Sequence, residues 1–475
     1  MFAVLFVINL ILAFTIIFLE RKDPSATLAW LLVLFLLPGA GIVLYIVFSQ
    51  NVSRQKIFTL FENEEKLVTS ALKKQHKELQ LKKFNFDNQV GYVWSDLIKL
   101  NQLYGESYYT QHNNVEIFTD GISKMKRLFE DIDGAKERIN IEYFIIKDDV
   151  VGNAFIDILT KKAEEGIEVR LLVDALGSRK INKNKIDLFK KAGGKYGEFF
   201  PTVLKLFNSK INYRNHRKIV VIDDYIGYTG GFNIAREYVG LKKKFGFWRD
   251  THLRLEGNSV KDLNFRFMLD WRSATKENMD IEGMLFKPEI KNGNVGVQIV
   301  SCGPERESEE IKMGFLKMIS AARKSIYIQT PYFVPDEPIL DSIKMAAQSG
   351  VEVNIMIPCI PDHMFVYWAT YSYVGEIIKA GGNVYIYDKG FLHAKTIIVD
   401  GEVCSVGSCN FDMRSFKLNF ETNAFIYDRR TSRKLEDAFR EDIKNSHRLT
   451  NELYQQRGYY IKIKEVFSRM LSDIL

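Results

Sequence analysis

The chain has 475 residues, which is long enough for two or three domains that each bury a core. Charged residues make up 26% of it and hydrophobic residues 46%, a composition that excludes an intrinsically disordered protein. The formal net charge is +7, and the acids and bases of residues 1–50 cancel. The excess on the remainder favours an anionic partner: a membrane surface, nucleic acid or a phosphorylated substrate.

Two apolar segments at the N-terminus predict a pair of transmembrane helices. Residues 2–19 carry no charge and, at ~1.5 Å per residue, would span about 27 Å of a hydrocarbon core that is ~30 Å thick. Residues 26–48 form a second run that Pro38 would kink or make re-entrant, and the polar residues 20–25 join the two. A cleavable signal peptide is the alternative, but no basic residue precedes the first run.

The basic segment that follows predicts the orientation. Residues 51–83 carry eight Lys and Arg against four acids, whereas residues 20–25 have two Lys and Arg. The positive-inside rule therefore predicts a multi-pass membrane protein with both termini and the large C-terminal portion in the cytoplasm. We expect residues 51–100 to form a basic helical linker beside an anionic leaflet, although a solvated charged linker explains their composition almost as well.

From about residue 101 the chain repeats itself. Residues 166–174 parallel residues 350–358, for example. Each unit alternates strand and helix patterns before a β-branched run, which predicts an α/β fold with a largely parallel sheet covered on both faces. We expect two α/β domains, residues 101–285 and 286–475, that pack so that their equivalent motifs meet.

The most informative pattern is His-x-Lys-x4-Asp, which occurs once in each repeat. Small residues and an asparagine follow it at identical offsets. The two copies are His216, Lys218, Asp223, Gly230, Gly231 and Asn233, and His393, Lys395, Asp400, Gly407, Ser408 and Asn410. One His-x-Lys alone could be a surface histidine on a basic strand, but two of only seven histidines share this long register. One copy supplies half of a site, and two copies can supply a nucleophile and an acid.

These residue types suit the chemistry of a phosphate. In His-x-Lys the two side chains are two residues apart, so that on a strand they would project from the same face. The histidine can attack phosphorus or protonate the leaving oxygen, while the lysine neutralises charge on the other oxygens. The two His, Lys and Asp sets are therefore the candidate catalytic residues. Because of their odd spacing, however, we expect Asp223 and Asp400 to point to the opposite face and to be structural.

The residues beyond each aspartate predict substrate contacts. Asn233 and Asn410 can donate amide hydrogens to the same phosphate oxygens. Gly231 and Ser408 are small and allow close approach of the backbone. We therefore expect these four residues to bind substrate.

Each reactive histidine also needs an acid that holds its tautomer. The candidates are Asp250 and Glu421, which stand 34 and 28 residues after His216 and His393. The remaining histidines are scattered without the spacing of metal ligands, so we expect neither a metal nor another cofactor.

The motifs resemble those of the phospholipase D superfamily, in which two HxKxxxxD motifs form one active site. More narrowly, segments along nearly the whole chain are similar to bacterial cardiolipin synthases. These segments are residues 23–39, 212–218, 230–233, 248–254, 329–335 and 413–421. The resemblance implies two tandem phospholipase D-like α/β domains that share one active site, preceded by an N-terminal transmembrane helical hairpin. It also implies a multi-pass protein of the bacterial cytoplasmic membrane whose catalytic domains face the cytoplasm.

The resemblance also implies an activity. A phosphatidyl group would pass between two phosphatidylglycerol molecules through a phosphatidyl-histidine, giving cardiolipin and glycerol. By analogy with the superfamily, His216 would be the nucleophile and His393 the acid and base. Phosphatidylglycerol and anionic membrane lipids are the implied partners, and the oligomeric state stays open. The alternatives are a phospholipase D-type hydrolase, a transphosphatidylase that acts on another phospholipid, and a nuclease, against which two membrane helices would argue.

Two further segments mix apolar residues with cations. Residues 242–248 could dip into an anionic interface or form a packed loop. Residues 461–475 have apolar residues at helical spacing, and docking onto the core is the default expectation over lying on a membrane.

Overall fold

The computed structural model describes residues 2–19, 24–37, 39–42, 45, 57–201, 212–286, 290–470 and 472. It divides into two compact units. The N-terminal unit is Met1–Gln55 with Thr202–Tyr213, and the large unit is Lys56–Pro201 with Arg214–Leu475.

The N-terminal unit contains short helices. These are α1 (Phe2–Phe14), the π-helix η1 (Thr15–Leu19) and α2 (Pro24–Leu36). Ile16, Leu34 and Tyr45 form its small core, and Asn9 donates a hydrogen bond to the Leu34 carbonyl at 3.0 Å. The unit therefore has its own packing between α1, η1 and α2.

These helices correct the membrane prediction. None of the helices formed by the described residues combines the length and the apolar character that crossing a bilayer requires. At ~1.5 Å per residue, the 13 residues of α1 or of α2 cover about 20 Å of a hydrocarbon core that is ~30 Å thick. The predicted transmembrane hairpin and the multi-pass localisation in the cytoplasmic membrane are therefore wrong. Residues 20–23 of the expected turn, and Pro38, lie outside the described residues.

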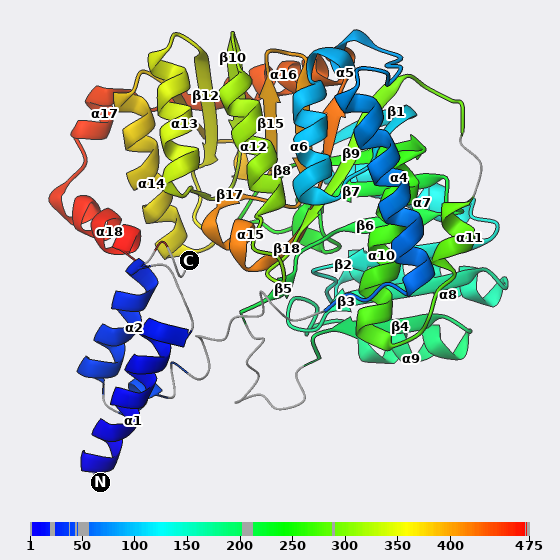
Figure 1. Cartoon of the computed structure of the whole chain (residues 1–475), viewed down its shortest axis with the longest axis horizontal. Helices are drawn as coiled ribbons and strands as arrows, with labels where there is room; N and C mark the ends of the chain where they lie inside the picture. Colours follow the sequence, from blue (N-terminus) through cyan, green and yellow to red (C-terminus); the bar gives the residue numbers. More distant parts are fainter. Residues whose placement is uncertain are drawn as a thin grey trace. The chain divides into compact units, whose positions relative to one another are not determined.

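The large unit carries the two repeats (Figure 1). Its first part comprises α4 (Glu62–Gln80), α5 (Gln89–Val93), α6 (Ser95–Gly105), β1 (Tyr109–Asp120), α7 (Gly121–Asp133), β2 (Arg138–Tyr143), α8 (Val150–Glu164), β3 (Glu168–Asp174), α9 (Lys183–Lys191), β4 (Lys195–Phe199), β5 (Arg214–Asn215), β6 (Ile219–Ile222), β7 (Ile226–Gly230), the 3-10 helix η2 (Arg236–Val239), β8 (Phe247–Gly257), α10 (Ser259–Thr275) and α11 (Ile281–Leu285). Its second part comprises β9 (Val295–Cys302), α12 (Glu310–Ala321), β10 (Ser325–Gln329), β11 (Phe333–Val334), α13 (Glu337–Gln348), β12 (Glu352–Pro358), α14 (Met364–Lys379), β13 (Asn383–Tyr387), β14 (Gly390–Leu392), β15 (Thr396–Val399), β16 (Val403–Gly407), β17 (Phe411–Asp412), α15 (Met413–Lys417), β18 (Asn419–Tyr427), α16 (Arg429–Ile443), β19 (Ser446–Arg448), α17 (Asn451–Gln455) and α18 (Tyr459–Met470).

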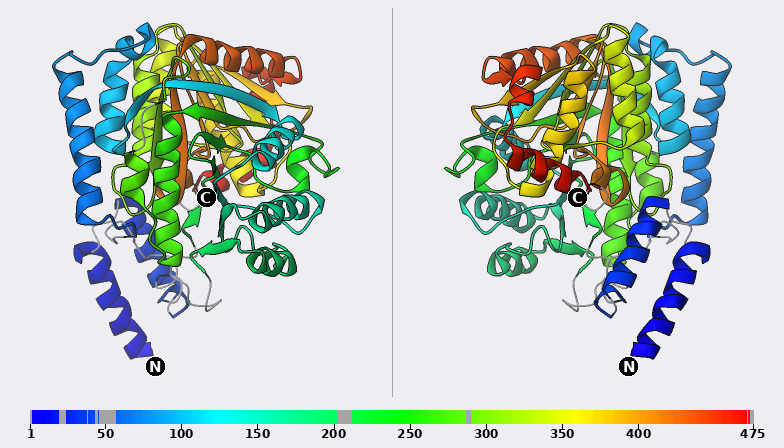
Figure 2. Two further views of the ribbon diagram at one scale, coloured as in Figure 1. Left: turned by 90° about the vertical axis from the view of Figure 1, so that its right-hand side faces the viewer. Right: turned by 90° about the vertical axis from the view of Figure 1, so that its left-hand side faces the viewer.

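The strands of both parts pair in one mirrored order. The pairings run β4-β3-β2-β6-β7-β8-β1 in the first part and β9-β18-β16-β15-β10-β12-β13-β19 in the second, and the antiparallel pair β1–β9 joins them. Figure 2 shows helices along both faces of these strands. The predicted tandem α/β architecture is therefore confirmed.

The prediction of a largely parallel sheet needs correction. Parallel pairing joins β2, β3 and β4 in the first part and β10, β12 and β13 in the second. The strands β6–β7–β8 and β15–β16–β18 are antiparallel. Tight turns join β6 to β7 and β15 to β16, directly after each β-branched run, whereas longer connections lead into β8 and β18. The sheet is mixed.

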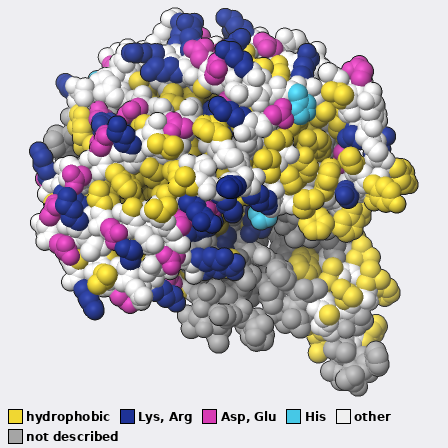
Figure 3. Space-filling view, turned by 180° about the vertical axis from the view of Figure 1, so that it is seen from behind, with side chains coloured by type: hydrophobic (Ala, Val, Ile, Leu, Met, Phe, Trp, Pro, Cys, Tyr) yellow, Lys and Arg dark blue, Asp and Glu magenta, His cyan; other side chains and the backbone are white. Residues whose placement is uncertain are grey.

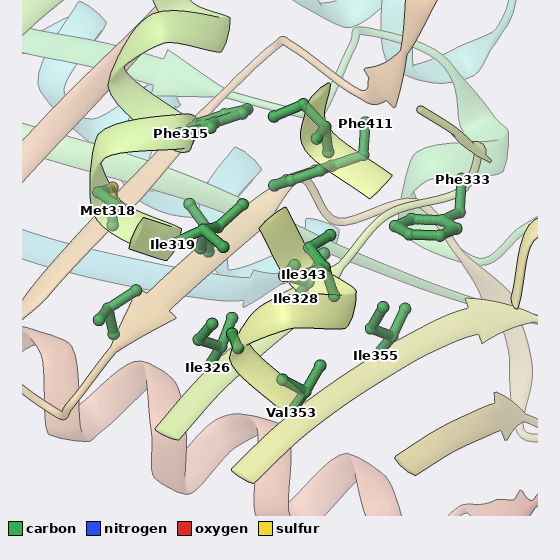
Figure 4. Packing of buried hydrophobic residues seen from close by; sticks show 14 of the residues in the cluster. Phe315, Met318, Ile319, Ile326, Ile328, Phe333, Ile343, Val353, Ile355 and Phe411 are labelled. Carbon is green, nitrogen blue, oxygen red and sulfur yellow. The ribbon is translucent and has the colours of Figure 1, made fainter. Parts of the chain in front are cut away.

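Helix packing fixes the strands beneath the motifs. In the second part, Phe315 and Ile319 of α12 lie against Ile326 and Ile328 of β10 in one buried cluster (Figure 4). The apolar residues of α12 recur every three or four positions, so that one face of the helix meets the sheet. Because β10 pairs with β15, this cluster holds in place the strand that begins directly after Lys395.

Candidate active site

Short strands exchange between the two parts directly before each motif. In the first part, β5 pairs in parallel with β18 of the second part, and the His216 amide donates to the Phe420 carbonyl at 2.9 Å. In the second part, β14 pairs in parallel with β8 of the first part, and the His393 amide donates to the Arg249 carbonyl at 2.7 Å. Each histidine is therefore held against a strand of the opposite part.

The exchange places each histidine beside an acid of the other part. Nδ1 of His216 lies 3.0 Å from both carboxylate oxygens of Glu421. Nδ1 of His393 lies 2.6 Å from Oδ2 of Asp250. The orienting acids thus pair crosswise, and neither histidine pairs with the acid that follows it in its own repeat. A proton held on Nδ1 leaves the Nε2 lone pair available for chemistry.

Burial keeps both imidazoles neutral. The side chains of His216 and His393 are 12% and 10% exposed, and both acids are fully buried. Burial, with help from Lys218 and Lys395, lowers the pKa of His216 in spite of Glu421. Burial and Lys395 likewise lower the pKa of His393 to about 4. Neutral imidazole is the form that can attack phosphorus or accept a proton.

The acids stay ionised beside these imidazoles. Burial alone would raise the pKa of Asp250 and of Glu421. Lys395 and His393 outweigh burial at Asp250, and His216 and Lys218 outweigh it at Glu421, so that the pKa of each carboxyl is lowered. A carboxylate beside each ring stabilises the imidazolium that forms during proton transfer.

The two lysines supply positive charge to the same place. Nζ of Lys218 donates to the His216 carbonyl at 2.5 Å, and Nζ of Lys395 lies 2.8 Å from Nδ1 of His393. Burial lowers the pKa of Lys218 to about 7 and that of Lys395 to about 8, and Lys395 adds to the shift at Lys218. The two ammonium groups therefore repel each other across the site, and a phosphate between them would relieve that repulsion.

One expectation about the motif backbone is wrong. The stretches 216–218 and 393–395 lie outside the strands and precede β6 and β15, so same-face projection along a strand does not bring histidine and lysine together. Each lysine instead folds back onto the carbonyl of its own histidine. The residue between them in the first motif, Arg217, points into the protein and pairs with Asp270 at 2.9 Å.

The motif aspartates bind backbone rather than the histidines. The Asp223 carboxylate accepts hydrogen bonds from three consecutive amides, those of Lys136, Glu137 and Arg138, of which the last begins β2. The Asp400 carboxylate does the same for the three amides that begin at Arg323, before β10. This geometry agrees with the structural role and not with their place in the catalytic set.

The small residues make room for the acids. A Cβ at Gly231 would overlap the Asp250 carboxylate. At the equivalent position, the hydroxyl of Ser408 accepts from the Thr422 amide at 3.0 Å and lowers the pKa of the neighbouring Glu421. Both positions therefore serve the acids, a role that their small size alone did not reveal.

The two asparagines lie close to the motifs but already have partners. Asn233 donates from its amide nitrogen to the Tyr238 hydroxyl at 2.9 Å. Asn410 donates to the Ser415 hydroxyl at 3.2 Å, and its carbonyl oxygen is buried without a hydrogen-bond partner among the described residues. A phosphate contact by either amide would have to share these hydrogens.

Aromatic side chains surround the histidines, and sequence reasoning did not assign them to the site. The Phe144 ring lies 4.9 Å from that of His216, and the rings of Trp248 and Tyr238 lie 5.1 Å and 6.3 Å from that of His393. Trp248 is buried here, so it does not take part in an exposed interface loop. These aromatic residues lie close in sequence to the repeated segments or to the motif residues, and this proximity could have revealed them.

Different buried cations lie near the two orienting acids. Lys124 is fully buried and donates to the Tyr143 hydroxyl at 2.8 Å. His252 follows Asp250 by two residues on β8, and neither of its ring nitrogens has a hydrogen-bond partner among the described residues. Beside Glu421 the buried cation is instead Arg217, whose Nε donates to the Glu421 carbonyl at 3.3 Å, so the two halves of the site are not equivalent.

Metal-binding residues were also sought in the part of the chain that the structure describes. No group of three or more His, Cys, Asp or Glu side chains there could hold a metal ion. Independence from cofactors stays a prediction.

Known proteins match this chain closely. A family model described as "Cardiolipin synthase, PLD-like domain" matches residues 128–247 and 315–443, and one described as phospholipase D-nuclease N-terminal matches residues 7–50. The chain is 48% identical over 471 residues to a major cardiolipin synthase of Bacillus subtilis (strain 168), covering 99% of this chain and 98% of that protein. It is 47% identical over 470 residues to a cardiolipin synthase of Oceanobacillus iheyensis, with the same coverage.

A solved structure shares the fold. The crystal structure of phosphatidylserine synthase from Haemophilus influenzae Rd KW20 has a TM-score of 0.62 and covers 80% of this chain and 100% of its own. Its sequence is 14% identical, so this likeness concerns the fold alone.

Proposed function

The chain belongs to the cardiolipin synthase family of phospholipase D-like proteins, and from that premise we propose that it is a phosphatidyltransferase. It transfers a phosphatidyl group between two phosphatidylglycerol molecules and gives cardiolipin and glycerol. The observation that carries this proposal is the crossed pairing of His216 with Glu421 and of His393 with Asp250. In each pair the acid contacts Nδ1, so that Nε2 is the atom left to attack phosphorus at His216 and to carry the proton at His393.

The first step forms a phosphorus–nitrogen bond. Nε2 of His216 attacks the phosphorus of one phosphatidylglycerol, and the bond from phosphorus to the glycerol headgroup oxygen breaks. The proton that glycerol takes as it leaves comes from Nε2 of His393, which takes it up from solvent beside Asp250 before this step and regains one from the acceptor hydroxyl in the next step. Lys218 and Lys395 neutralise the charge that builds up on the other phosphate oxygens.

The second step is the reverse of the first, with another phosphatidylglycerol in place of glycerol. His393, now neutral, accepts the proton of a headgroup hydroxyl from another phosphatidylglycerol. The resulting oxygen attacks phosphorus, the bond to His216 breaks, and cardiolipin forms. Since both histidines have lowered pKa values, His393 carries a proton only transiently, while Asp250 stabilises it. The assignment of nucleophile and acid rests on analogy with the superfamily.

The alternatives differ in the acceptor or in the donor lipid. A hydrolase would pass the phosphatidyl group to water and give phosphatidic acid, and another transphosphatidylase would use a different phospholipid. Both would use the same histidines, so only product analysis separates them. The full-length relatives are named cardiolipin synthases, which supports the synthase and a lipid rather than a nucleic-acid partner.

The partners follow from this substrate. A lipid donor and a lipid acceptor place the enzyme at an anionic membrane surface. The N-terminal unit exposes large apolar side chains, among them Phe14 and Phe35, and residues 7–50 match a family model of their own. We infer that this unit contacts lipid, and that the functional organisation is this segment (1–50), a linking region (51–100) and the repeats 101–285 and 286–475.

Purified full-length protein with labelled phosphatidylglycerol tests the function. Chromatography of the lipid products should show cardiolipin, with an equal amount of glycerol released. The variants His216→Ala and His393→Ala should abolish transfer, and only His393→Ala should retain an acid-labile phosphatidyl label on the protein. Phosphatidic acid as the main product would overturn the synthase reading, and full activity of either variant would overturn the mechanism.

A further inference from the structure

Helix α18 exposes its apolar face and buries polar residues. In an amphipathic helix that packs on a core, apolar residues face inward and polar residues face solvent. In α18 the buried residues are Glu465 and Ser468. A stripe of large apolar side chains is exposed instead: Tyr459, Tyr460, Ile463, Val466, Phe467 and Met470. The default expectation that this helix docks its apolar face onto the core is therefore wrong.

Polar and cationic contacts hold the helix in this orientation. Glu465 pairs with Arg457 at 2.7 Å. Arg469 lies over the Tyr373 ring of α14 at 4.5 Å, and Lys464 lies 5.2 Å from the Trp368 ring of the same helix. The inner face of α18 thus makes ion-pair and cation–π contacts with α14 and with Arg457. The exposed stripe is therefore a defined surface of the folded unit.

The stripe continues to the edge of the active site. The Phe467 ring lies 6.4 Å from that of Phe365 in the exposed first turn of α14. Directly before that turn, Asp362 accepts a hydrogen bond from the Tyr332 hydroxyl. The charge of Asp362 raises the pKa of both His393 and Lys395 against the effect of burial, so the first turn of α14 begins close to the candidate active site.

A cationic loop borders the same site. Leu241, Lys243 and Lys244 are exposed, while Phe245 of this loop is buried against Trp248 and Phe391. Trp248 in turn contacts His393, so the loop is tied to the site through this aromatic layer. Figure 3 shows hydrophobic side chains gathered on the side of the molecule that carries α17 and α18, with lysines and arginines beside them.

We propose that the exposed stripe of α18, the first turn of α14 and the lysine loop at 241–244 form one docking surface for an anionic lipid bilayer. Exposed aromatic and aliphatic side chains gain free energy in the interfacial layer, and lysines gain it near anionic headgroups. Lys462 and Lys464 flank the apolar stripe on the helix itself, which matches a negatively charged surface. The exposed apolar area has the composition of a membrane contact rather than of scattered surface residues.

The proposal rests on the proposed function and deepens it. A docking surface that borders the histidines lets a phosphatidylglycerol headgroup reach the phosphate site while its acyl chains stay in the bilayer. The enzyme would then take both donor and acceptor from one leaflet without extracting either lipid.

Photo-crosslinking tests the surface without requiring turnover. Wild-type full-length protein is mixed with vesicles of phosphatidylglycerol and phosphatidylcholine that contain phosphatidylglycerol with a photoreactive group in its acyl chain. Peptides that contain residues 459–470 should carry the label, and label that is absent from them would overturn the proposal. This result does not depend on whether the enzyme makes cardiolipin.

A variant separates docking from chemistry. Tyr460→Glu with Val466→Glu places two charges where the side chains are 81% and 62% exposed, away from the catalytic groups. Activity on phosphatidylglycerol vesicles should fall at least about tenfold, since two large apolar contacts with the bilayer are lost. Activity on monomeric short-chain phosphatidylglycerol should be unchanged. Ile122→Glu on α7, where the side chain is 67% exposed, should change neither activity.

The other outcomes count either against the surface or against the proposed function. Unchanged activity on vesicles would overturn it, and so would an equal loss on both substrates, which would indicate damage to the fold. A variant of lower molecular mass than the wild type in detergent would show that a second copy of the chain covers the stripe instead. Wild-type protein that makes no cardiolipin from the monomeric substrate would sink the proposed function, and the crosslinking result would still decide the surface.

Discussion

Replacing Asp250 by Asn tests the crossed pairing most directly. The Asp250 carboxylate and the His393 ring are joined at 2.6 Å, and the carboxylate is fully buried. An asparagine keeps the shape, but one side of its amide is a hydrogen-bond donor and not an acceptor. The variant side chain therefore no longer holds the proton of His393 on Nδ1. The imidazolium that forms during transfer also loses its counter-charge.

The size of the loss follows from that geometry. With charge centres about 4 Å apart and an effective dielectric constant of ~20, the lost attraction is ~4 kcal/mol. Because this attraction stabilises the transition state of proton transfer, its loss lowers the rate roughly a thousandfold. The initial rate of cardiolipin formation from phosphatidylglycerol measures it. Asp341→Asn, which removes an exposed charge from α13, should have no effect.

Which of the two histidines changes in this variant is a sharper test than the size of the rate loss. Nitrogen-15 NMR of the histidine rings reports the tautomer of each one. In the Asp250→Asn variant, His393 should change its tautomer and His216 should not, although Asp250 and His216 belong to the same repeat. A changed His216 beside an unchanged His393, or a rate equal to that of the wild type, would refute the crossed pairing.

Three other substitutions or conditions test the surrounding groups. An ammonium is charged below its pKa, so kcat/KM should fall as the pH rises through about 7 to about 8, where Lys218 and Lys395 lose their protons; Lys218→Arg should move this limb to higher pH. Asp400→Ala removes the acceptor of three backbone amides and should lower the free energy of unfolding by about 2 to 4 kcal/mol in thermal melts, while folded enzyme keeps its rate. Gly231→Ala pushes against Asp250 and should reduce activity as Asp250→Asn does, whereas Gly458→Ala, with open space around it, should not.

The local patterns of the sequence predicted the paired motifs well. Repetition of His-x-Lys-x4-Asp, with Gly231 or Ser408 in register, is a property of neighbouring residues and can be read without a fold. The acids Asp250 and Glu421 were also recognisable, because each lies in a β-rich stretch at a similar distance after its motif. These features are short-range, so the sequence pattern alone was enough.

The features that the sequence did not predict depend on distant parts of the chain. Which acid serves which histidine is decided by β5 and β14, strands of two and three residues that are too short to carry a periodic signal. The apolar run 2–19 has the length of a membrane span, but it divides into α1 and the π-helix η1. In α18, periodicity identified the apolar face correctly, while only the contacts with α14 determine that this face points outward.

The crossed acids also bear on how the chain is made and broken down. His216 leaves the ribosome about two hundred residues before Glu421, the acid that orients it. A nascent chain that ends before Glu421, or an N-terminal fragment cut between the repeats, therefore holds His216 without its orienting acid, and the C-terminal fragment holds His393 without Asp250. A cut between the repeats thus leaves neither fragment with a complete pair of histidine and orienting acid.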